Sequence, residues 1–305
     1  MIKEESAYMV QKVQDYIERN ITKPITIKQL SRVAGYSPWY LARTFKEVTG
    51  KGLFEYIRLR RLTQAALILR DENKKVIDVA LDFVFDSQEG FTRAFSREFG
   101  IAPGRYKSKT PPIKLFLPEK AYDTYRALHK AKNQNERMEN MTKSIFVQVI
   151  ERPERKCLLK RGKKAEDYFE YCEEVGCEIW NVLTSVKEAL YEPVGLWLPK
   201  QLISENTSMY VQGVELPMDY NKEIPEGFEI IALPPCTMMI FQGEPYQDEG
   251  FEYEVTEVMN HADKFNPEIY GYQWAPEQAP RFQLMPMGYR GYIEARPVEK
   301  CNISN

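Results

Sequence analysis

Residues 37–50 read SPWYLARTFKEVTG, and residues 87–100 read SQEGFTRAFSREFG. At a constant offset of 50, the two stretches share a serine at the start, an arginine and a phenylalanine in the middle, and a glycine at the end. Serine is a favourable N-cap and glycine a favourable C-cap, so each stretch predicts one helix. The repetition predicts two copies of one helical motif.

A shorter helix is expected before each copy, at about 26–33 and 75–83, and these two segments match at an offset of 49. Between the copies, residues 53–70 carry the strongest helical periodicity of the chain, and an amphipathic helix is expected at 7–20. Eighteen helical residues extend about 27 Å. The sequence therefore predicts an all-α domain with two helix-turn-helix units joined by a long helix, which is a more specific pattern than one unit alone.

The charge of the chain is distributed unevenly. Its 305 residues predict two domains and carry a formal net charge of −2. Residues 1–110 have a net charge of +7, residues 111–140 of +2, and residues 141–305 of −11. A basic helical half joined to an acidic half is a reason to test the basic half for nucleic-acid binding.

The composition excludes several classes of protein. The first residues lack the apolar core of a signal peptide, and no stretch is apolar enough to span a membrane, so we expect a cytoplasmic protein. The odd number of cysteines, five, indicates reduced thiols. With two histidines and no Cys-x-x-Cys pair, the sequence predicts neither a metal site nor a cofactor.

The expected domain boundaries follow from composition and periodicity. A tandem helix-turn-helix domain is expected at 1–110, a linker at 111–142 with a short helix at 119–131, and an α+β domain at 143–305. The second domain shows strand patterns interrupted by helices at about 173–190 and 249–264. Residues 152–162 resemble 233–243, each with a proline turn, an apolar strand and a glycine, so a second duplication is expected.

The helices of the two copies each leave a polar face opposite the apolar one. Leu41 and Phe45 mark the apolar side of the first helix, and Phe91 and Phe95 that of the second. Side chains that can read bases in a major groove lie on the opposite sides. A single tryptophan at the start of a helix usually packs half-buried against its neighbours, and a single arginine on a helix face is usually solvated. Arginines at equivalent positions of a repeat favour DNA binding instead.

The residues of the two copies and the stretch after them resemble a known family. Three stretches, at 35–45, 83–95 and 99–107, are similar to the DNA-binding domain of the AraC family, in its Rob-type subgroup of multidrug and oxidative-stress activators. The resemblance implies that both recognition helices enter successive major grooves of double-stranded DNA. It places base contacts at Trp39, Ala42, Arg43, Gln88, Thr92 and Arg93. Positive charges suited to phosphates are Lys28, Lys46, Arg97, Arg105 and Lys107.

Two residues depart from the family pattern. Ser31 stands where an alanine is usual, which is a mild change. Val84 stands where the second turn usually has a glycine, so we expect this turn to be reshaped and its helix re-aimed.

The acidic half is rich in aromatic residues, which with a carboxylate can bind organic cations. Its layout and its ending at 291–298 resemble the GyrI-like effector domain, a duplicated strand-helix-strand-strand module with a pocket between its halves. The resemblance implies a pocket for a hydrophobic or cationic small molecule. The expected lining residues are Trp180, Trp197, Tyr210, Tyr272, Trp274, Tyr292 and Glu294.

Together these patterns predict a transcription regulator, an activator that contacts RNA polymerase and responds to a small molecule. Two other functions of the second domain stay open at this level. It could be a hydrolase in which Glu294 and a tyrosine act as base and acid, or an acidic module that binds a basic protein.

Overall fold

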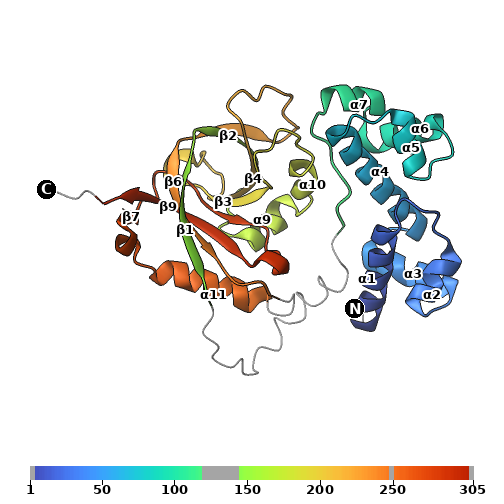
Figure 1. Ribbon diagram of the computed structural model, residues 1–305, viewed down its shortest axis with the longest axis horizontal. Helices are drawn as coiled ribbons and strands as arrows, with labels where there is room; N and C mark the ends of the chain where they lie inside the picture. The colour runs from blue at the N-terminus through green and yellow to red at the C-terminus, as the bar shows by residue number, and fades with distance from the viewer. Residues whose placement is uncertain (1–3, 119–143, 247–250, 302–305) are drawn as a thin grey trace. The chain divides into compact units, whose positions relative to one another are not determined.

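The computed structural model describes residues 4–118, 144–246 and 251–301 (Figure 1). The chain divides into two compact units, Met1–Met138 and Glu139–Asn305. The short helix expected at 119–131 lies outside the described residues. In the part of the chain that the structure describes, no helix is both long enough and apolar enough to cross a membrane.

In its described residues the first unit contains helices and no strands, as the sequence predicts. Its helices lie within a few residues of the expected bounds, and a short seventh helix, α7, follows the two repeats. They are α1 (Glu4–Arg19), α2 (Ile27–Ala34), α3 (Pro38–Thr49), α4 (Leu53–Asp71), α5 (Val76–Asp82), α6 (Gln88–Phe99) and α7 (Pro103–Lys109).

The repeated stretches form α3 and α6 with matching ends. Ser37 Oγ accepts a hydrogen bond from the backbone N–H of Tyr40 at 3.3 Å, and Ser87 Oγ accepts one from Gly90 at 3.1 Å. Both helices stop at a glycine with φ of +70°, a left-handed conformation that side chains disfavour. The caps predicted from sequence are therefore present in both copies.

The two turns of the helix-turn-helix units share a residue in the left-handed conformation, although the second turn is longer. Gly35, at the end of α2, has φ of +76°, and Val84, at the equivalent place after α5, has φ of +62°. The expectation that Val84 reshapes the second turn is wrong for the backbone, because the valine adopts the left-handed conformation that glycine provides in the first turn. A β-branched residue in this conformation is strained.

The long helix α4 supports both units. Its first half contributes Leu53, Tyr56 and Ile57 to a core with α1, α2 and α3. Its second half contributes Leu62, Ala66 and other residues to a second core with α5, α6 and α7. The two helix-turn-helix units are thus built on one continuous element, coloured between the blue and green segments of Figure 1.

The described part of the expected linker belongs to the first unit. Ile113 and Leu115 are buried in the second core, and the backbone N–H of Phe116 donates to Thr63 Oγ1 at 2.9 Å. Thr63 is itself fully buried on α4. The predicted boundary at residue 110 is therefore too early, because apolar residues after Pro112 complete the helical core.

The second unit is built on one nine-stranded, antiparallel sheet. Its order is β1-β6-β9-β8-β3-β4-β2-β5, and β7 pairs with β9 at the side. The strands are β1 (Phe146–Arg152), β2 (Arg155–Arg161), β3 (Val194–Trp197), β4 (Tyr210–Leu216), β5 (Glu229–Leu233), β6 (Cys236–Gln242), β7 (Tyr272–Trp274), β8 (Arg281–Leu284) and β9 (Ile293–Lys300).

The strand order contains a duplication with exchanged first strands. The arrangement β1, β2, helices, β3, β4 is repeated as β5, β6, helix, β8, β9. However, β1 pairs with β6 of the second half, and β5 pairs with β2 of the first. Because two residues join β1 to β2 and two join β5 to β6, the sheet must curl until its distant strands meet.

A buried charge cluster holds these two connections. Glu215 is paired with Arg152, and its Oε1 lies 2.9 Å from Arg155 Nε. Arg155 also donates to the carbonyl oxygens of Pro153 and Pro234, at 3.1 Å each. Since these prolines lie in the two connections, one guanidinium joins the exchanged strands.

Helices cover one face of the sheet, whereas the other face encloses a core of its own. The helices are α9 (Tyr168–Val175), α10 (Ile179–Leu183) and α11 (Phe251–Lys264), with short 3-10 turns η1 (Lys200–Leu202), η3 (Pro267–Tyr270) and η4 (Gly288–Arg290). The single helix expected at 173–190 is wrong, because α9 ends before Gly176, which has φ of +89°.

Replacing Val84 by glycine is expected to stabilise the first unit by about 1 kcal/mol. A left-handed conformation costs an L-residue ~1–2 kcal/mol, and the greater backbone entropy of glycine in the unfolded chain offsets part of the strain that is relieved. Urea denaturation of the full chain, followed by circular dichroism, measures the change. Gly35→Val, the matched change in the first turn, is expected to destabilise. A Val84→Gly chain that unfolds at lower urea contradicts the strain.

Candidate functional site

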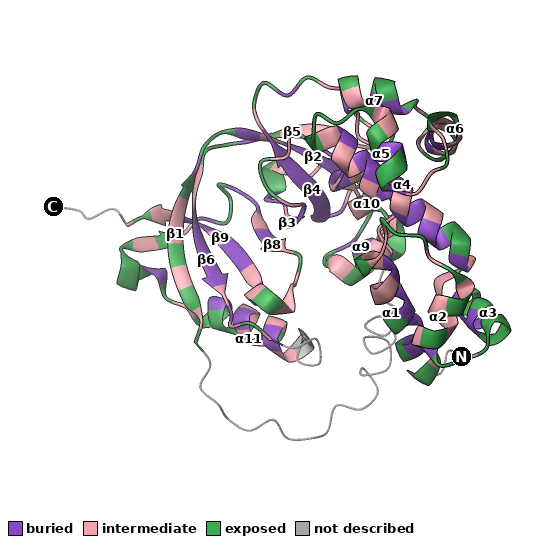
Figure 2. Cartoon of the chain, turned by 45° about the vertical axis from the view of Figure 1, so that its right-hand side comes forward, coloured by how far each residue is buried: buried purple, intermediate pink, exposed green. Residues whose placement is uncertain are grey.

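Helix α3 exposes the residues that the sequence assigns to base contacts. Leu41 and Phe45 are fully buried, whereas Trp39 is 69% exposed and Ala42 and Arg43 are exposed on the opposite side. Figure 2 shows this contrast between the exposed surface of α3 and the buried α4. Trp39 is therefore not a packing residue of the core.

Arg43 is held between two neighbours on the same side of α3. Its guanidinium carbon lies 5.6 Å from the centre of the Trp39 ring, and its Nε lies 2.7 Å from Glu47 Oε1. The hydrogen bond to Glu47 and the charge of that carboxylate raise the pKa of Arg43.

Helix α6 presents a corresponding face. Phe91 and Phe95 are fully buried, and Gln88 and Arg93 are exposed. A hollow on this surface is lined by Gln88, Glu89, Thr92 and Arg93. The three residues predicted to contact bases from the second helix thus lie together around one concave patch.

Four of the five residues expected to contact phosphates are exposed: Lys28, Lys46, Arg97 and Arg105. Lys107 differs, because it is half-buried and its Nζ donates to the carbonyl oxygen of Lys74 at 2.9 Å. Its positive charge is used in part to fix the loop before α5.

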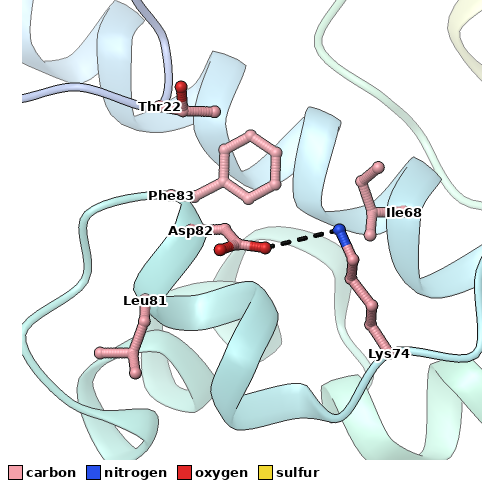
Figure 3. A pocket seen from close by; sticks show the side chains of 6 residues that line it. All are labelled: Thr22, Ile68, Lys74, Leu81, Asp82 and Phe83. Atoms are coloured by element: carbon pink, nitrogen blue, oxygen red, sulfur yellow. Dashed lines mark ion pairs between the residues drawn. The ribbon is translucent and has the colours of Figure 1, made fainter.

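A second hollow of the first unit lies between the α1–α2 loop, α4 and α5 (Figure 3). Thr22 from the α1–α2 loop, Ile68 from α4 and Phe83 from the end of α5 line it. Lys74 Nζ lies 3.6 Å from Asp82 Oδ2 at its edge. The ion pair connects the end of α5 to the loop between α4 and α5 on this side.

The second unit does not bring all the predicted pocket residues together. Trp180, Trp197 and Tyr210 pack in a cluster with α9 and α10, whereas Tyr272 and Trp274 pack in another cluster with α11. The structure therefore divides the expected aromatic lining between two clusters.

Hydrogen bonds connect the two clusters at the middle of the sheet. Tyr292 donates its hydroxyl proton to Gln283 Oε1 at 2.8 Å, and Gln283 Nε2 donates to Tyr210 Oη at 3.1 Å. A side chain at Gly195 would overlap the Tyr210 hydroxyl, so this glycine makes room for the chain of hydrogen bonds. Burial raises the pKa of Tyr210, and burial and the Glu294 carboxylate raise that of Tyr292.

Glu294 is fully buried and paired with two arginines. Its Oε2 lies 2.8 Å from Arg281 Nη2, and its Oε1 lies 2.6 Å from Arg296 Nε. The Arg281 guanidinium also stacks 4.3 Å from the centre of the Trp197 ring. The expected pocket carboxylate is thus already neutralised by residues of its own chain.

Sequence reasoning missed Arg281, Gln283 and Arg296 as members of this centre. Gln283 pairs with Glu294 across β8 and β9 and with Gly195 across β8 and β3. The alternation of β8 would have placed Arg281 and Gln283 on one face, but the strand order is needed to set Glu294 beside them. Among the described residues, no group of three histidine, cysteine or acidic side chains could hold a metal ion.

Comparison with known proteins places the first unit in a family. The family described as a helix-turn-helix domain matches residues 30–109. The transcriptional regulator Rob of Salmonella typhimurium is 38% identical over 108 residues, which are 33% of this chain and 37% of Rob. The chain thus spans less than half the length of this relative.

The regulatory protein SoxS of Salmonella typhimurium is 40% identical over 101 residues, which are 33% of this chain and 94% of SoxS. Because nearly all of SoxS is covered at this identity, the chain belongs, through its first unit, to the AraC family of helix-turn-helix proteins. The solved DNA-binding domain of AdpA in complex with a target DNA is 21% identical over 40% of this chain and 96% of that chain, with a TM-score of 0.32.

Replacing Glu294 by glutamine is expected to destabilise the second unit by about 2–4 kcal/mol, because the half-buried Arg281 loses its counter-charge and Arg296 keeps only Asp263 as a partner. Thermal and urea unfolding of the full chain measure the loss. Glu205→Gln removes the same charge from an exposed position and is expected to change little. Equal stability of the two variants contradicts a buried ion-pair role for Glu294.

Proposed function

We propose that this chain is a sequence-specific, DNA-binding transcription regulator. The observation that carries the proposal is the pair of exposed arginines, Arg43 and Arg93, at equivalent positions of two helices fixed to α4. The 19 residues of α4 extend about 28 Å, which is close to one turn of DNA at about 34 Å. The two helices are therefore suited to successive major grooves on one side of a duplex.

Membership in the AraC family supports this function. In the proposed complex with DNA, α3 contacts bases through Trp39, Ala42 and Arg43. The helix α6 contacts bases through Gln88, Thr92 and Arg93. Lys28, Lys46, Arg97 and Arg105 contact phosphates, while Lys107 mainly positions the loop before α5. The two faces differ in composition, so the target is an asymmetric site.

The second unit is proposed to be a GyrI-like domain that binds a small-molecule effector and changes the activity of the first. Its duplicated halves meet at the Tyr292–Gln283–Tyr210 centre, which supports a ligand site there. Since Glu294 is paired with two arginines, we expect hydrophobic contact with Trp197 to dominate over attraction of a cation. The same pairing argues against Glu294 as the base of a hydrolase.

In this proposal the effector shifts an equilibrium of the regulator, and the regulator activates transcription by contacting RNA polymerase. A ligand can shift such an equilibrium only by its difference in affinity between the two states. Activation and the polymerase contact rest on the Rob-type resemblance of the first unit.

Arg93→Ala is expected to weaken binding to a selected target duplex by about 5- to 150-fold, because a bidentate arginine–guanine contact is worth ~1–3 kcal/mol. Titrating duplexes selected from a random library measures the loss. Binding to unrelated duplexes is expected to change much less.

Arg19→Ala, at an exposed position of α1 outside both helix-turn-helix units, removes the same charge and serves as the matched control. If Arg93→Ala binds the selected duplex as tightly as the wild-type chain does, the assignment of base contacts to α6 is wrong.

A thermal-shift screen of the full chain against a library of hydrophobic small molecules is expected to find ligands of the second unit. A ligand at 100 times its dissociation constant adds about 2.7 kcal/mol of stability. Trp197→Leu is expected to abolish the shift, whereas Arg93→Ala is expected to keep it. Shifts that survive Trp197→Leu place the ligand elsewhere.

A further inference from the structure

The two recognition helices carry the same arginine in different electrostatic surroundings. On α3, Trp39, Arg43 and Glu47 follow one another at four-residue spacing, and all are exposed. The Arg43–Glu47 ion pair is solvent-accessible, with the two side chains 60% and 56% exposed. Residues four apart share one side of a helix, so Glu47 lies beside the base-contacting face of α3.

On α6, the equivalent positions fifty residues later are Glu89, Arg93 and Arg97. The order of charge is reversed, with the acid before the arginine and a second positive charge after it. Within the described residues of the first unit, Arg93 makes no ion pair. The repeat thus keeps the arginine but not the residue that restrains it.

The stability of α3 does not account for Glu47. This residue lies in the last turn of α3, where the helix dipole favours cations and disfavours carboxylates. An acid placed after its basic partner is also the less favourable order for a pair at four-residue spacing. Helix stability therefore does not explain why a glutamate occupies position 47.

Such a reason follows from the properties of arginine and of DNA. A free arginine side chain samples many rotamers and binds any phosphate within reach, which adds affinity without sequence information. A carboxylate beside it restricts the guanidinium and repels phosphates, which raises the free energy of non-specific complexes.

We propose that Glu47 is a specificity-determining residue of the first recognition helix. Its carboxylate orients Arg43 along α3 and penalises backbone contacts there, so that Arg43 binds a guanine edge in preference to phosphate. This inference rests on the proposed function of DNA binding. It also makes the two helices unequal, because α6 has no carboxylate at the position of Glu47 and carries Arg97 there, which adds general affinity through phosphate contact.

The test compares Glu47→Gln with the wild-type chain. Its binding to a random-sequence duplex is measured over a range of salt concentrations. Selection from a randomised library gives the base preference, and Arg43→Ala identifies the base position that depends on Arg43. Glu98→Gln, an equal change of charge at an exposed position of α6 turned away from its base-contacting face, is the matched control.

Glu47→Gln is expected to bind the random duplex about 3- to 10-fold more tightly at low salt. The slope of the logarithm of its binding constant against the logarithm of salt concentration is expected to become steeper by up to about 1, the value for one added phosphate contact. Its guanine preference at the Arg43-dependent position is expected to relax. Glu98→Gln is expected to match the wild-type chain in all three measurements.

The inference is overturned if Glu47→Gln leaves random-duplex affinity, salt dependence and base preference unchanged. It is also overturned if the variant loses affinity for random and selected duplexes equally, which indicates a merely structural role. A wild-type chain that selects no sequence is a different result, because it overturns the proposed function itself.

Discussion

The packing of two cores against one helix, α4, is the constraint on which the first unit depends. Arg60, near the middle of α4, donates to both carboxylate oxygens of Glu18 on α1, at 2.7 and 2.8 Å. Arg60 also donates to the carbonyl oxygen of Phe116 at 2.6 Å. Phe116 belongs to the segment after α7 that completes the second core. One buried guanidinium therefore joins α1, α4 and the segment that follows α7. Both recognition helices are packed on this element, so α4 sets the spacing between them.

Duplication supplies this architecture but does not make its copies equivalent. The serine and glycine caps and the buried Phe45 and Phe95 match, and so does the left-handed backbone at Gly35 and Val84. The exposed residues have diverged, because they are not required for packing. Glu47 in one copy and Arg97 in the other give the two arginines opposite electrostatic neighbours.

The second unit uses duplication differently, since its halves exchange their first strands and share a polar centre. Arg155 bonds to both strand connections, and Gln283 joins Tyr292 to Tyr210. Most of these bonds join residues that are far apart in the sequence. Beside the same polar centre, Arg281 and Arg296 occupy the expected cation site at Glu294.

Local patterns were enough to predict most of the first unit. Helix bounds, the serine and glycine caps and the exposed faces of α3 and α6 depend on residues within one or two turns of one another, so spacing alone determines them. The strand exchange, the true end of the helical core and the partners of Glu294 were not predictable in this way. They depend on residues such as Thr63 and Phe116, or Arg281 and Glu294, which only strand order and core packing bring into contact.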